Sequence, residues 1–270
     1  MSIIFDAHCH IFPSKIAEKA TNSIGSFYDI PMQRVGSPEA LLHEMDIAGI
    51  RKALVCSTAT RAGQVHAINR FIADAEAAAG GRFLGFGTLH QDLTDEEMQD
   101  EIESFAALGL HGVKLHPDFQ SLPIDLPKMI PVYKELAKRK LPVLFHMGDD
   151  RYDFSAPERL ARVCEEVPEL RAMAAHLGGY RVWERADCLV PFENVVFDCS
   201  STLGLVSDEA VLRQFDLLGA DRILYGSDFP MWSPAGVIAK LRSLSLGRDV
   251  EELVFHGNFE KFLVLGAWKK

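Results

Sequence analysis

The sequence predicts an α/β fold, a single-domain (β/α)8 (TIM) barrel over residues 1–270 with a longer insertion after the first strand. Short apolar, β-rich runs recur along the chain. Most begin about 30 residues after the previous one, which is the length of one strand and one returning helix. Segments with helical spacing lie between these runs. An open doubly wound sheet shares this pattern, but eight alternations in 270 residues favour the closed barrel.

The predicted strands share β-branched and aromatic residues and are bounded by turn residues. No Gly-x-Gly-x-x-Gly or Walker pattern follows the first of them, so the sequence does not predict a nucleotide-binding loop. The predicted strands are Ile3–His10, Lys52–Ser57, Phe83–Leu89, Gly112–His116, Pro142–Met147, Arg171–His176, Val195–Ser200 and Ile223–Asp228.

Several predicted helices have readable ends. Ser37 followed by Pro38 is typical of a capped helix start, and Thr94 with Glu97 three residues later indicates a capping box. Gly109 is the expected stop of that second helix. Two further helices are predicted to open at Ser155-Ala156-Pro157 and to span Ser207–Gly219.

The connection from Ile11 to Gly36 is unusually long and contains Gly, Ser and Pro. An insertion after the first strand of a barrel lies over the active face, so residues 11–36 are expected to form either a lid or a passive decoration.

Composition excludes several function classes. A net charge of −10 argues against nucleic-acid binding. No basic leader or membrane-length apolar run is present, which predicts a cytoplasmic protein without membrane contact. The cysteines are odd in number and include no Cys-x-x-Cys pair, which suits a reducing compartment. They are Cys9, Cys56, Cys164, Cys188 and Cys199.

Polar residues able to bind metal stand where apolar strands end. A barrel collects the carboxyl ends of its strands on one rim, so these residues are expected to converge there. Imidazole and carboxylate ligands suit zinc, with manganese, iron or cobalt as other occupants. The residues concerned are His8, His10, Lys114, His116, His146, His176 and Asp228.

Four segments together resemble the amidohydrolase superfamily, in its amidohydrolase-related (amidohydrolase 2) branch of metal-dependent barrel hydrolases and decarboxylases. They are Phe5-Asp6-Ala7-His8-Cys9-His10, Phe145-His146, Ala175-His176-Leu177-Gly178-Gly179 and Tyr225-Gly226-Ser227-Asp228-Phe229-Pro230, in the family's order across nearly the whole chain. The resemblance implies that His8, His10, His146 and Asp228 bind the metal. It also implies that His176 polarises substrate or shuttles protons beside it.

The activity expected from this set is hydrolysis of an amide, ester or lactone carbonyl of a small molecule. One zinc ion would lower the pKa of its bound water from about 15.7 toward roughly 7, and the resulting hydroxide would attack. Asp228 would take the remaining proton, and His176 would stabilise the oxyanion. The alternatives are a non-oxidative decarboxylase or hydratase of a small aromatic or unsaturated carboxylic acid, and a non-catalytic metal- or ligand-binding barrel.

Four residues are expected to contact substrate or to support the metal ligands. Lys114 and His116 alternate onto one face, and Asp6 is the acidic neighbour that a buried Lys114 needs. Arg151 is expected either to clamp a substrate carboxylate or to lie in a solvated loop. In dihydroorotase-like relatives a carboxylated lysine bridges two metals, but a second metal on Lys114 is not favoured here. By analogy with the family, a homodimer is expected.

Overall fold

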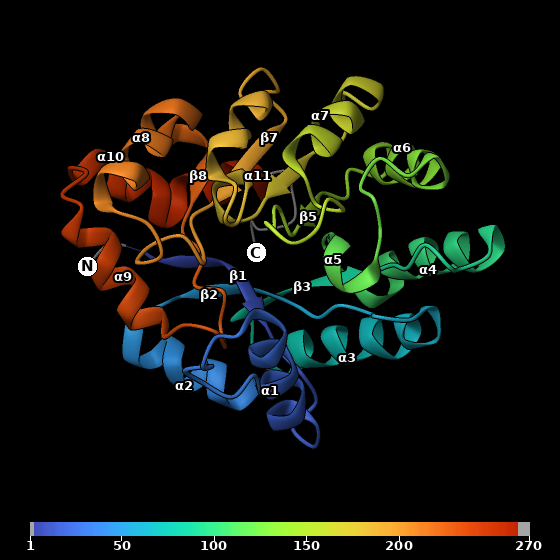
Figure 1. Ribbon diagram of the computed structural model, residues 1–270. Helices are drawn as coiled ribbons and strands as arrows, with labels where there is room; N and C mark the ends of the chain where they lie inside the picture. Colours follow the sequence, from blue (N-terminus) through green and yellow to red (C-terminus); the bar gives the residue numbers. More distant parts are fainter. Residues whose placement is uncertain (1–2, 264–270) are drawn as a thin grey trace. The chain divides into compact units, whose positions relative to one another are not determined.

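All eight predicted strands are present in the computed structural model, which describes residues 3–263 (Figure 1). They form one sheet in the order β1 to β8. β1 pairs with β2, and β3 through β7 pair in succession, all in parallel. The bounds are β1 (Phe5–His10), β2 (Lys52–Cys56), β3 (Phe83–Thr88), β4 (Val113–Leu115), β5 (Val143–Phe145), β6 (Ala172–Ala174), β7 (Val195–Asp198) and β8 (Ile223–Leu224).

The first strand also lies beside the segment that follows the last. The backbone N–H of Ala7 donates to the carbonyl of Tyr225 over 2.8 Å, and Cys9 forms a parallel bridge with Phe229. This neighbour relationship is the one that closes a (β/α)8 barrel. The predicted fold class is therefore confirmed.

Several strands end earlier than predicted. β4 stops at Leu115, β5 at Phe145 and β6 at Ala174, each one or two residues before a histidine. The ladder ends there because the next backbone groups turn away into loops or short helices. The polar residues of interest therefore follow the strands.

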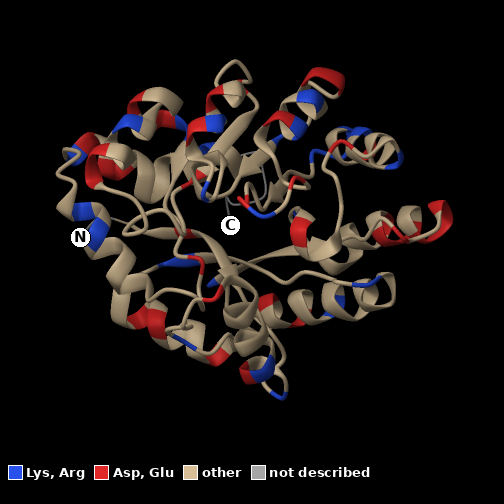
Figure 2. Cartoon of the chain, in the orientation of Figure 1, with Lys and Arg blue, Asp and Glu red and all other residues tan. Residues whose placement is uncertain are grey.

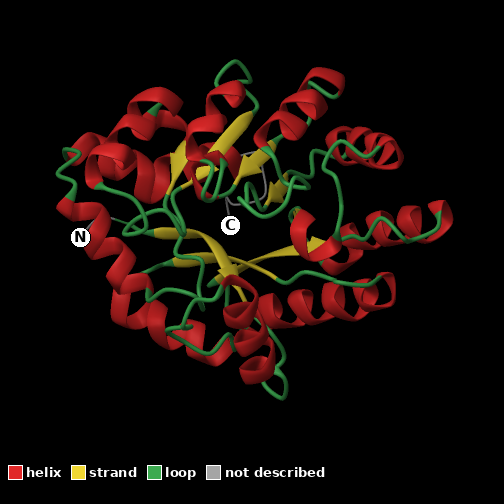
Figure 3. Cartoon of the chain, in the orientation of Figure 1, coloured by secondary structure: helices red, strands yellow, loops and turns green. Residues whose placement is uncertain are grey.

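Helices separate the strands along the chain, as the sequence predicts (Figure 3). Figure 2 shows acidic and basic residues interspersed along them. Over residues 3–263, no helix combines the length and apolar character needed to cross a bilayer. The helices are α1 (Ala17–Tyr28), α2 (Pro38–Ala48), α3 (Val65–Ala78), α4 (Asp95–Leu108), α5 (Pro117–Gln120), α6 (Ile130–Lys138), α7 (Pro157–Glu166), α8 (Asp208–Leu218), α9 (Pro234–Ser243), α10 (Arg248–Glu252) and α11 (Asn258–Leu263).

The predicted helix ends are mostly confirmed. Ser37 and Ser207 accept hydrogen bonds from the third residue beyond them, and Thr94 with Glu97 forms the reciprocal capping box. Such caps satisfy backbone N–H groups that the helix itself cannot, each contributing about 1 kcal/mol. The helix predicted to open at Ser155-Ala156-Pro157 is also confirmed: Ala156 occupies the cap position of α7, and the Ser155 hydroxyl donates to Asp118.

The chain divides into two compact units. The first comprises Met1–Ser57, Asp74–Leu84 and Cys199–Lys270, and the second comprises Thr58–Ala73 and Gly85–Asp198. The chain passes from one unit to the other within β3 and directly after β7. A single domain over 1–270 stays a prediction.

The first unit holds a core around β1, β2 and the C-terminal helices. The rings of Phe5 and Phe259 pack edge to face with centroids 5.8 Å apart, and Phe255 is fully buried. α2 and α9 lie side by side (Figure 1). Burying each such large apolar side chain contributes roughly 1.5–3 kcal/mol.

The insertion over residues 11–36 belongs to the first unit and carries α1. It is fastened to the loop that follows β8, because Gln33 N and Arg34 N donate to the carbonyls of Met231 and Pro230 over 3.2 and 3.1 Å. Gly36 N donates to the buried hydroxyl of Thr21 over 2.9 Å. The insertion is therefore tied to the loop that carries Asp228.

In the second unit a single amide ties three strand ends together. The Gln120 side chain donates to the carbonyls of Ala59 (3.1 Å) and Leu89 (2.7 Å) and accepts from His116 N (2.9 Å). Backbone groups left beyond the ladders of β2, β3 and β4 are satisfied in this way.

Candidate metal centre

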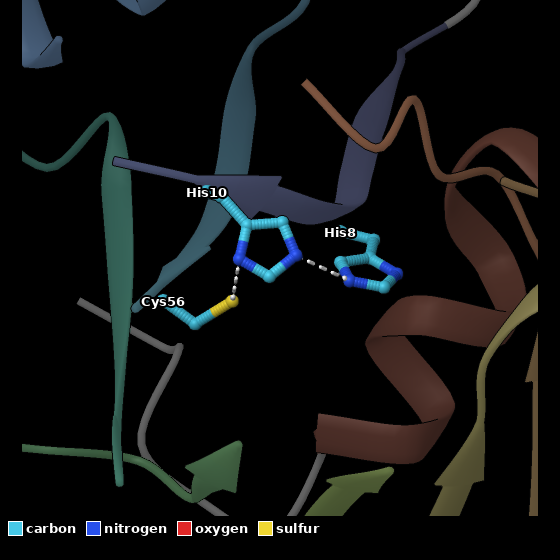
Figure 4. Close-up of side chains that lie close together, drawn as sticks. All are labelled: His8, His10 and Cys56. Carbon is cyan, nitrogen blue, oxygen red and sulfur yellow. Dashed lines mark hydrogen bonds between the residues drawn. The ribbon is translucent and has the colours of Figure 1, made fainter. Parts of the chain in front are cut away.

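β1 directs two imidazoles to one face, because alternate side chains of a strand point the same way. His8 Nε2 lies 3.1 Å from His10 Nε2 (Figure 4). His8 is fully buried, and the His10 side chain is 13% exposed. The spacing read from the sequence therefore brings both rings together.

Asp228 is the third member of this group. It follows β8, and its backbone N–H donates to the carbonyl of His8 over 2.9 Å, which fixes the residue beside β1. Its Oδ1 atom lies 3.8 Å from His8 Nε2 and 3.5 Å from His10 Nε2. Two residues that lie 220 positions apart in sequence number, 8 and 228, thus meet in the first unit.

The three ligand atoms have the spacing that a metal ion requires. Bonds of about 2.1 Å put neighbouring ligands about 3.0 Å apart in an octahedron and about 3.4 Å apart in a tetrahedron. The observed separations of 3.1, 3.5 and 3.8 Å lie close to these values. The residues of the first unit therefore fit a divalent cation.

The outer nitrogens of both rings have polar neighbours. His8 Nδ1 lies 3.1 Å from the Ser200 hydroxyl, and His10 Nδ1 lies 3.7 Å from the Cys56 sulfur (Figure 4). The Cys56 thiol itself donates to the carbonyl of Cys9. If each Nδ1–H donates outward, both Nε2 lone pairs remain available for a cation, which is the usual arrangement of metal-binding histidines.

The second carboxylate oxygen of Asp228, Oδ2, is held by a hydrogen bond from a serine. Ser201 donates its hydroxyl to Asp228 Oδ2 over 2.5 Å, and Trp232 Nε1 donates to Ser201 Oγ over 2.9 Å. All three side chains belong to the first unit.

Asp6 joins β1 to the segment before Asp228. Its Oδ1 accepts from the backbone N–H groups of Ser227 (2.9 Å) and His8 (3.2 Å). Burial raises the pKa of the Asp6 carboxyl to about 6, although these hydrogen bonds act in the opposite direction. In the first unit, Asp6 therefore positions the backbone of the ligand-bearing segments.

The second unit holds the other two predicted site histidines. His146 Nδ1 lies 3.0 Å from His176 Nε2, and His146 Nε2 lies 3.1 Å from the carbonyl of Gly148. A carbonyl can only accept, so His146 donates through Nε2 and keeps the Nδ1 lone pair. His176 follows β6 with a φ of 60°, in the left-handed region. The Nδ1 lone pair of His146 thus accepts from His176 Nε2 in this structure, and it would be the atom offered to a cation once that hydrogen bond opens.

His116 stacks on His146 rather than sharing a ligand position with it. The two rings are 4.0 Å apart and tilted by only 9°, and Phe119 covers the other side of His116 at 3.6 Å. Stacked parallel rings direct their lone pairs side by side and not to a common point. His116 therefore supports the His146 ring by packing.

Asp118 is an acidic neighbour of His146 that sequence reasoning missed. Its Oδ2 atom lies 3.4 Å from His146 Nε2 and accepts the Ser155 hydroxyl over 2.6 Å. Burial raises the pKa of Asp118 to about 7, despite the Ser155 hydrogen bond. Its position two residues after His116, directly beyond a buried strand, is the signal that could have identified it.

Lys114 and Arg151 also lie in the second unit. Lys114 is fully buried in β4, and its backbone carbonyl accepts from Thr88. Arg151 forms a bidentate ion pair with Asp149, in which Nε donates to Oδ1 over 2.9 Å and Nη2 donates to Oδ2 over 2.7 Å. A substrate carboxylate would have to compete with Asp149 for this guanidinium.

Among the predicted ligands, His8, His10 and Asp228 meet in the first unit, and His146 pairs with His176 in the second. The complete set of four ligands stays a prediction. Sequence reasoning missed the roles of Cys56, Ser200 and Ser201, although a polar run at the end of β7 marks the two serines.

The chain belongs to the family described as Amidohydrolase, which matches residues 5–265. This confirms the resemblance found in the sequence, and it supports an enzyme that binds a divalent metal.

Comparisons with individual proteins are consistent with this family. A 2-amino-3-carboxymuconate-6-semialdehyde decarboxylase from Dictyostelium discoideum is 25% identical, with 73% of this chain and 66% of the relative covered. The chain thus spans slightly less than two thirds of that relative. An uncharacterized TIM-barrel protein from Bordetella bronchiseptica has 20% identity and a TM-score of 0.81, covering 96% of this chain and 98% of its own. A dihydroxybenzoic acid decarboxylase from Polaromonas, with bound manganese and 2-nitroresorcinol, has 14% identity and a TM-score of 0.77, covering 99% and 98%.

These findings correct two predictions. The predicted hydrolase is wrong as the main activity, because the relatives with a named activity are decarboxylases, which favours the alternative reaction. Zinc in particular is not supported, since several structural neighbours, the Polaromonas protein among them, contain bound manganese. The physical reason for both errors is that two imidazoles and a carboxylate serve several metals and several reactions.

Proposed function

We propose that this protein is a divalent-metal-dependent, non-oxidative decarboxylase of a small aromatic or unsaturated carboxylic acid. The observation that carries the proposal is the convergence of His8 Nε2, His10 Nε2 and Asp228 Oδ1 within 3.8 Å in a chain whose named relative is a decarboxylase. His146 is proposed as the fourth ligand on the basis of its place after the fifth strand.

Non-oxidative decarboxylation replaces a carbon–carbon bond with a carbon–hydrogen bond. A proton must reach the carbon that carries the carboxylate, and the electron pair of the broken bond stays on that carbon as carbon dioxide leaves. A divalent cation bound by these residues would anchor substrate oxygens and withdraw electron density from the substrate. The protein's own task is then to deliver one proton to carbon.

We assign that proton delivery to Asp228, with His176 as the second group. As a ligand Asp228 is a carboxylate, so it would first take up a proton, from water or from an acidic group of the substrate, and then release that proton to the carbon. Asp228 Oδ1 is the oxygen nearest the two Nε2 atoms, so it is the oxygen closest to a substrate held there. General acid–base catalysis by a placed side chain contributes typically about 10²–10⁴-fold to rate. His176 Nε2 pairs with His146 and supports a role in proton supply.

The test is a product assay on metal-reconstituted protein. Manganese-loaded enzyme is incubated with a panel of dihydroxybenzoates, carboxyvanillate and carboxymuconate-type acids, alongside esters and lactones. We expect carbon dioxide release from a carboxylated substrate and, in D₂O, one deuterium at the carbon that lost the carboxyl group. Asp228→Asn is expected to lower kcat by about 10²–10⁴-fold. Turnover of esters or lactones without carbon dioxide release would overturn the proposal.

Metal identity, location and assembly complete the proposal. We favour Mn²⁺, since nitrogen and carboxylate ligands accept it and the Polaromonas neighbour contains it. A cytoplasmic location is supported by five cysteines that are all free thiols in the described residues. A homodimer is supported only by analogy with the family, and light scattering on purified protein tests it.

A further inference from the structure

The adjacent residues Ser200 and Ser201 each contact one of the ligands in the first unit. Ser200 Oγ lies 3.1 Å from His8 Nδ1, and Ser201 Oγ lies 2.5 Å from Asp228 Oδ2. We propose that this serine pair, supported by Trp232, positions the metal ligands: Ser200 exposes the Nε2 lone pair of His8, and Ser201 restricts Asp228 to binding through Oδ1 alone. The inference rests on the proposed metal site.

Ser200 selects the tautomer of His8. The Nε2 atom of His8 faces His10 Nε2 and Asp228 Oδ1. When a cation is bound, all three atoms direct lone pairs to it and none of them carries a proton. With a cation present, His8 must therefore carry its proton on Nδ1, and the Ser200 oxygen lies 3.1 Å away, within reach to accept it. Without that acceptor, the tautomer of His8 protonated on Nδ1 loses a stabilising hydrogen bond.

The direction of the Ser201 hydrogen bonds follows from the chemistry of Trp232. The indole N–H can only donate, so Ser201 Oγ accepts it over 2.9 Å. The hydroxyl proton of Ser201 then points to Asp228 Oδ2 at 2.5 Å, which is a stronger acceptor than the sulfur of Met231, 3.5 Å from Ser201 Oγ. The chain of donors runs from Trp232 through Ser201 to Asp228.

These hydrogen bonds leave one carboxylate oxygen of Asp228 for the metal. Oδ2 is engaged by Ser201, and Oδ1 is the atom that lies 3.5 Å from His10 Nε2 and 3.8 Å from His8 Nε2. Binding through both oxygens would require Oδ2 to leave Ser201. The serine therefore favours single-oxygen ligation and holds Oδ1 toward the two imidazoles.

Backbone geometry supports a positioning role. Ser201 has a φ of 46° and Asp228 a φ of 57°, both in the left-handed region that residues other than glycine rarely adopt. Strained conformations of this kind persist where the surrounding structure fixes them, and they cluster at functional sites. Here the two strained residues are the two partners of the 2.5 Å hydrogen bond.

The test separates positioning from stability through Ser201→Gly. Glycine accepts the left-handed backbone without strain and removes the small CH2OH side chain with its hydroxyl, so apo Ser201→Gly is expected to keep a Tm close to that of the wild type. We expect its Kd for Mn²⁺ to rise by about 10–100-fold, as when a supporting hydrogen bond to a ligand is lost. The electron paramagnetic resonance spectrum of bound Mn²⁺ is expected to change as well. Ser200→Ala and Trp232→Phe are expected to weaken Mn²⁺ binding, with the smaller effect for Trp232→Phe because it acts through Ser201.

The matched control is Ser207→Ala. Ser207 caps α8 and contacts no ligand of the group, so its loss is expected to lower Tm and leave Kd and spectrum unchanged. If Ser201→Gly had the same Kd for Mn²⁺ and the same spectrum as the wild type, the inference would be overturned, whereas the proposed metal site would not. Wild-type protein that binds no Mn²⁺, or binding that survives His8→Ala and His10→Ala unchanged, would overturn the proposed function and this inference together.

Discussion

Ser201 donates its hydroxyl to Oδ2 of Asp228 over 2.5 Å, and this leaves Oδ1 as the carboxylate oxygen nearest the histidines of β1. The ligand group of the first unit is thus built from three parts of the chain: an early strand, a loop after β8 and a serine pair after β7.

Metal binding is expected to depend on each imidazole of the predicted set. His8→Ala and His10→Ala remove Nε2 atoms that lie 3.1 Å apart, so metal content per chain is expected to fall to background by elemental analysis. His146→Ala is expected to do the same if it is the fourth ligand. His66→Ala is the control, because His66 is largely exposed and pairs with Glu101. Full metal content in His146→Ala would remove it from the ligand set.

The Gln120 amide is expected to be a large source of stability. Gln120→Met keeps the shape of the side chain but leaves the carbonyls of Ala59 and Leu89 and the N–H of His116 without this partner. We expect a loss of about 2–4 kcal/mol in the free energy of unfolding by urea titration. Gln99→Met, at an exposed position in α4, is expected to stay within about 0.5 kcal/mol of the wild type. Equal stability of the two variants would contradict the role of Gln120.

Acid stability is expected to depend on Asp125. Burial acts to raise the pKa of Asp125, but hydrogen bonds from Arg159 and Arg162, both on α7, outweigh it and hold the pKa below its usual 3.8. A lowered pKa means that the folded state favours the carboxylate, so the contribution is full well above pH 3.8 and is lost as the pH falls through the folded pKa.

Asp125→Asn is therefore expected to unfold more easily than the wild type at pH 7, by about 1 kcal/mol because the pairs are partly exposed. The difference should shrink as the pH falls below 3.8 and vanish once Asp125 is protonated in the folded state, because both forms of residue 125 are then neutral. Exposed Asp216→Asn serves as the control. A difference between Asp125→Asn and wild type that stays constant down to low pH would contradict this origin.

The insertion over residues 11–36 is expected to be rigid at its attachment. A Cβ atom at Gly36 would lie 2.8 Å from the Phe12 ring and 3.0 Å from Pro230, so Gly36→Ala forces one of them to move. We expect a cost of about 1–3 kcal/mol and faster hydrogen exchange at Gln33 and Arg34, whose N–H groups bond to the loop after β8. Gly63→Ala is the control, because no heavy atom lies within 4 Å of its added Cβ. Unchanged slow exchange at both amides in Gly36→Ala would contradict the role of Gly36, and fast exchange at both in the wild type would contradict the attachment itself.

The sequence predicts the strands and helix ends well because their signals are local. Thr94 and Glu97 lie three residues apart and satisfy each other's backbone, so the capping box is visible without any tertiary knowledge. The His8 and His10 pair is equally local, since the period of one strand places both rings on one face.

The sequence marks the supporting residues but not their partners, because those partners lie on distant segments. The polar run after β7 does not reveal that Ser201 bonds to Asp228, and the place of Asp118 beyond a buried strand does not reveal that it lies beside His146. The reaction was misread for a different reason. Two histidines and an aspartate define where a cation binds, whereas the bond that breaks depends on which substrate fills the remaining space.

The attachment of the insertion has a consequence for engineering. The backbone N–H groups of Gln33 and Arg34 donate to the carbonyls of Met231 and Pro230, which lie only three and two residues beyond Asp228. A chimera that exchanges residues 11–36 for those of another barrel would therefore also disturb the loop carrying Asp228, unless residues 230–233 are transplanted with it.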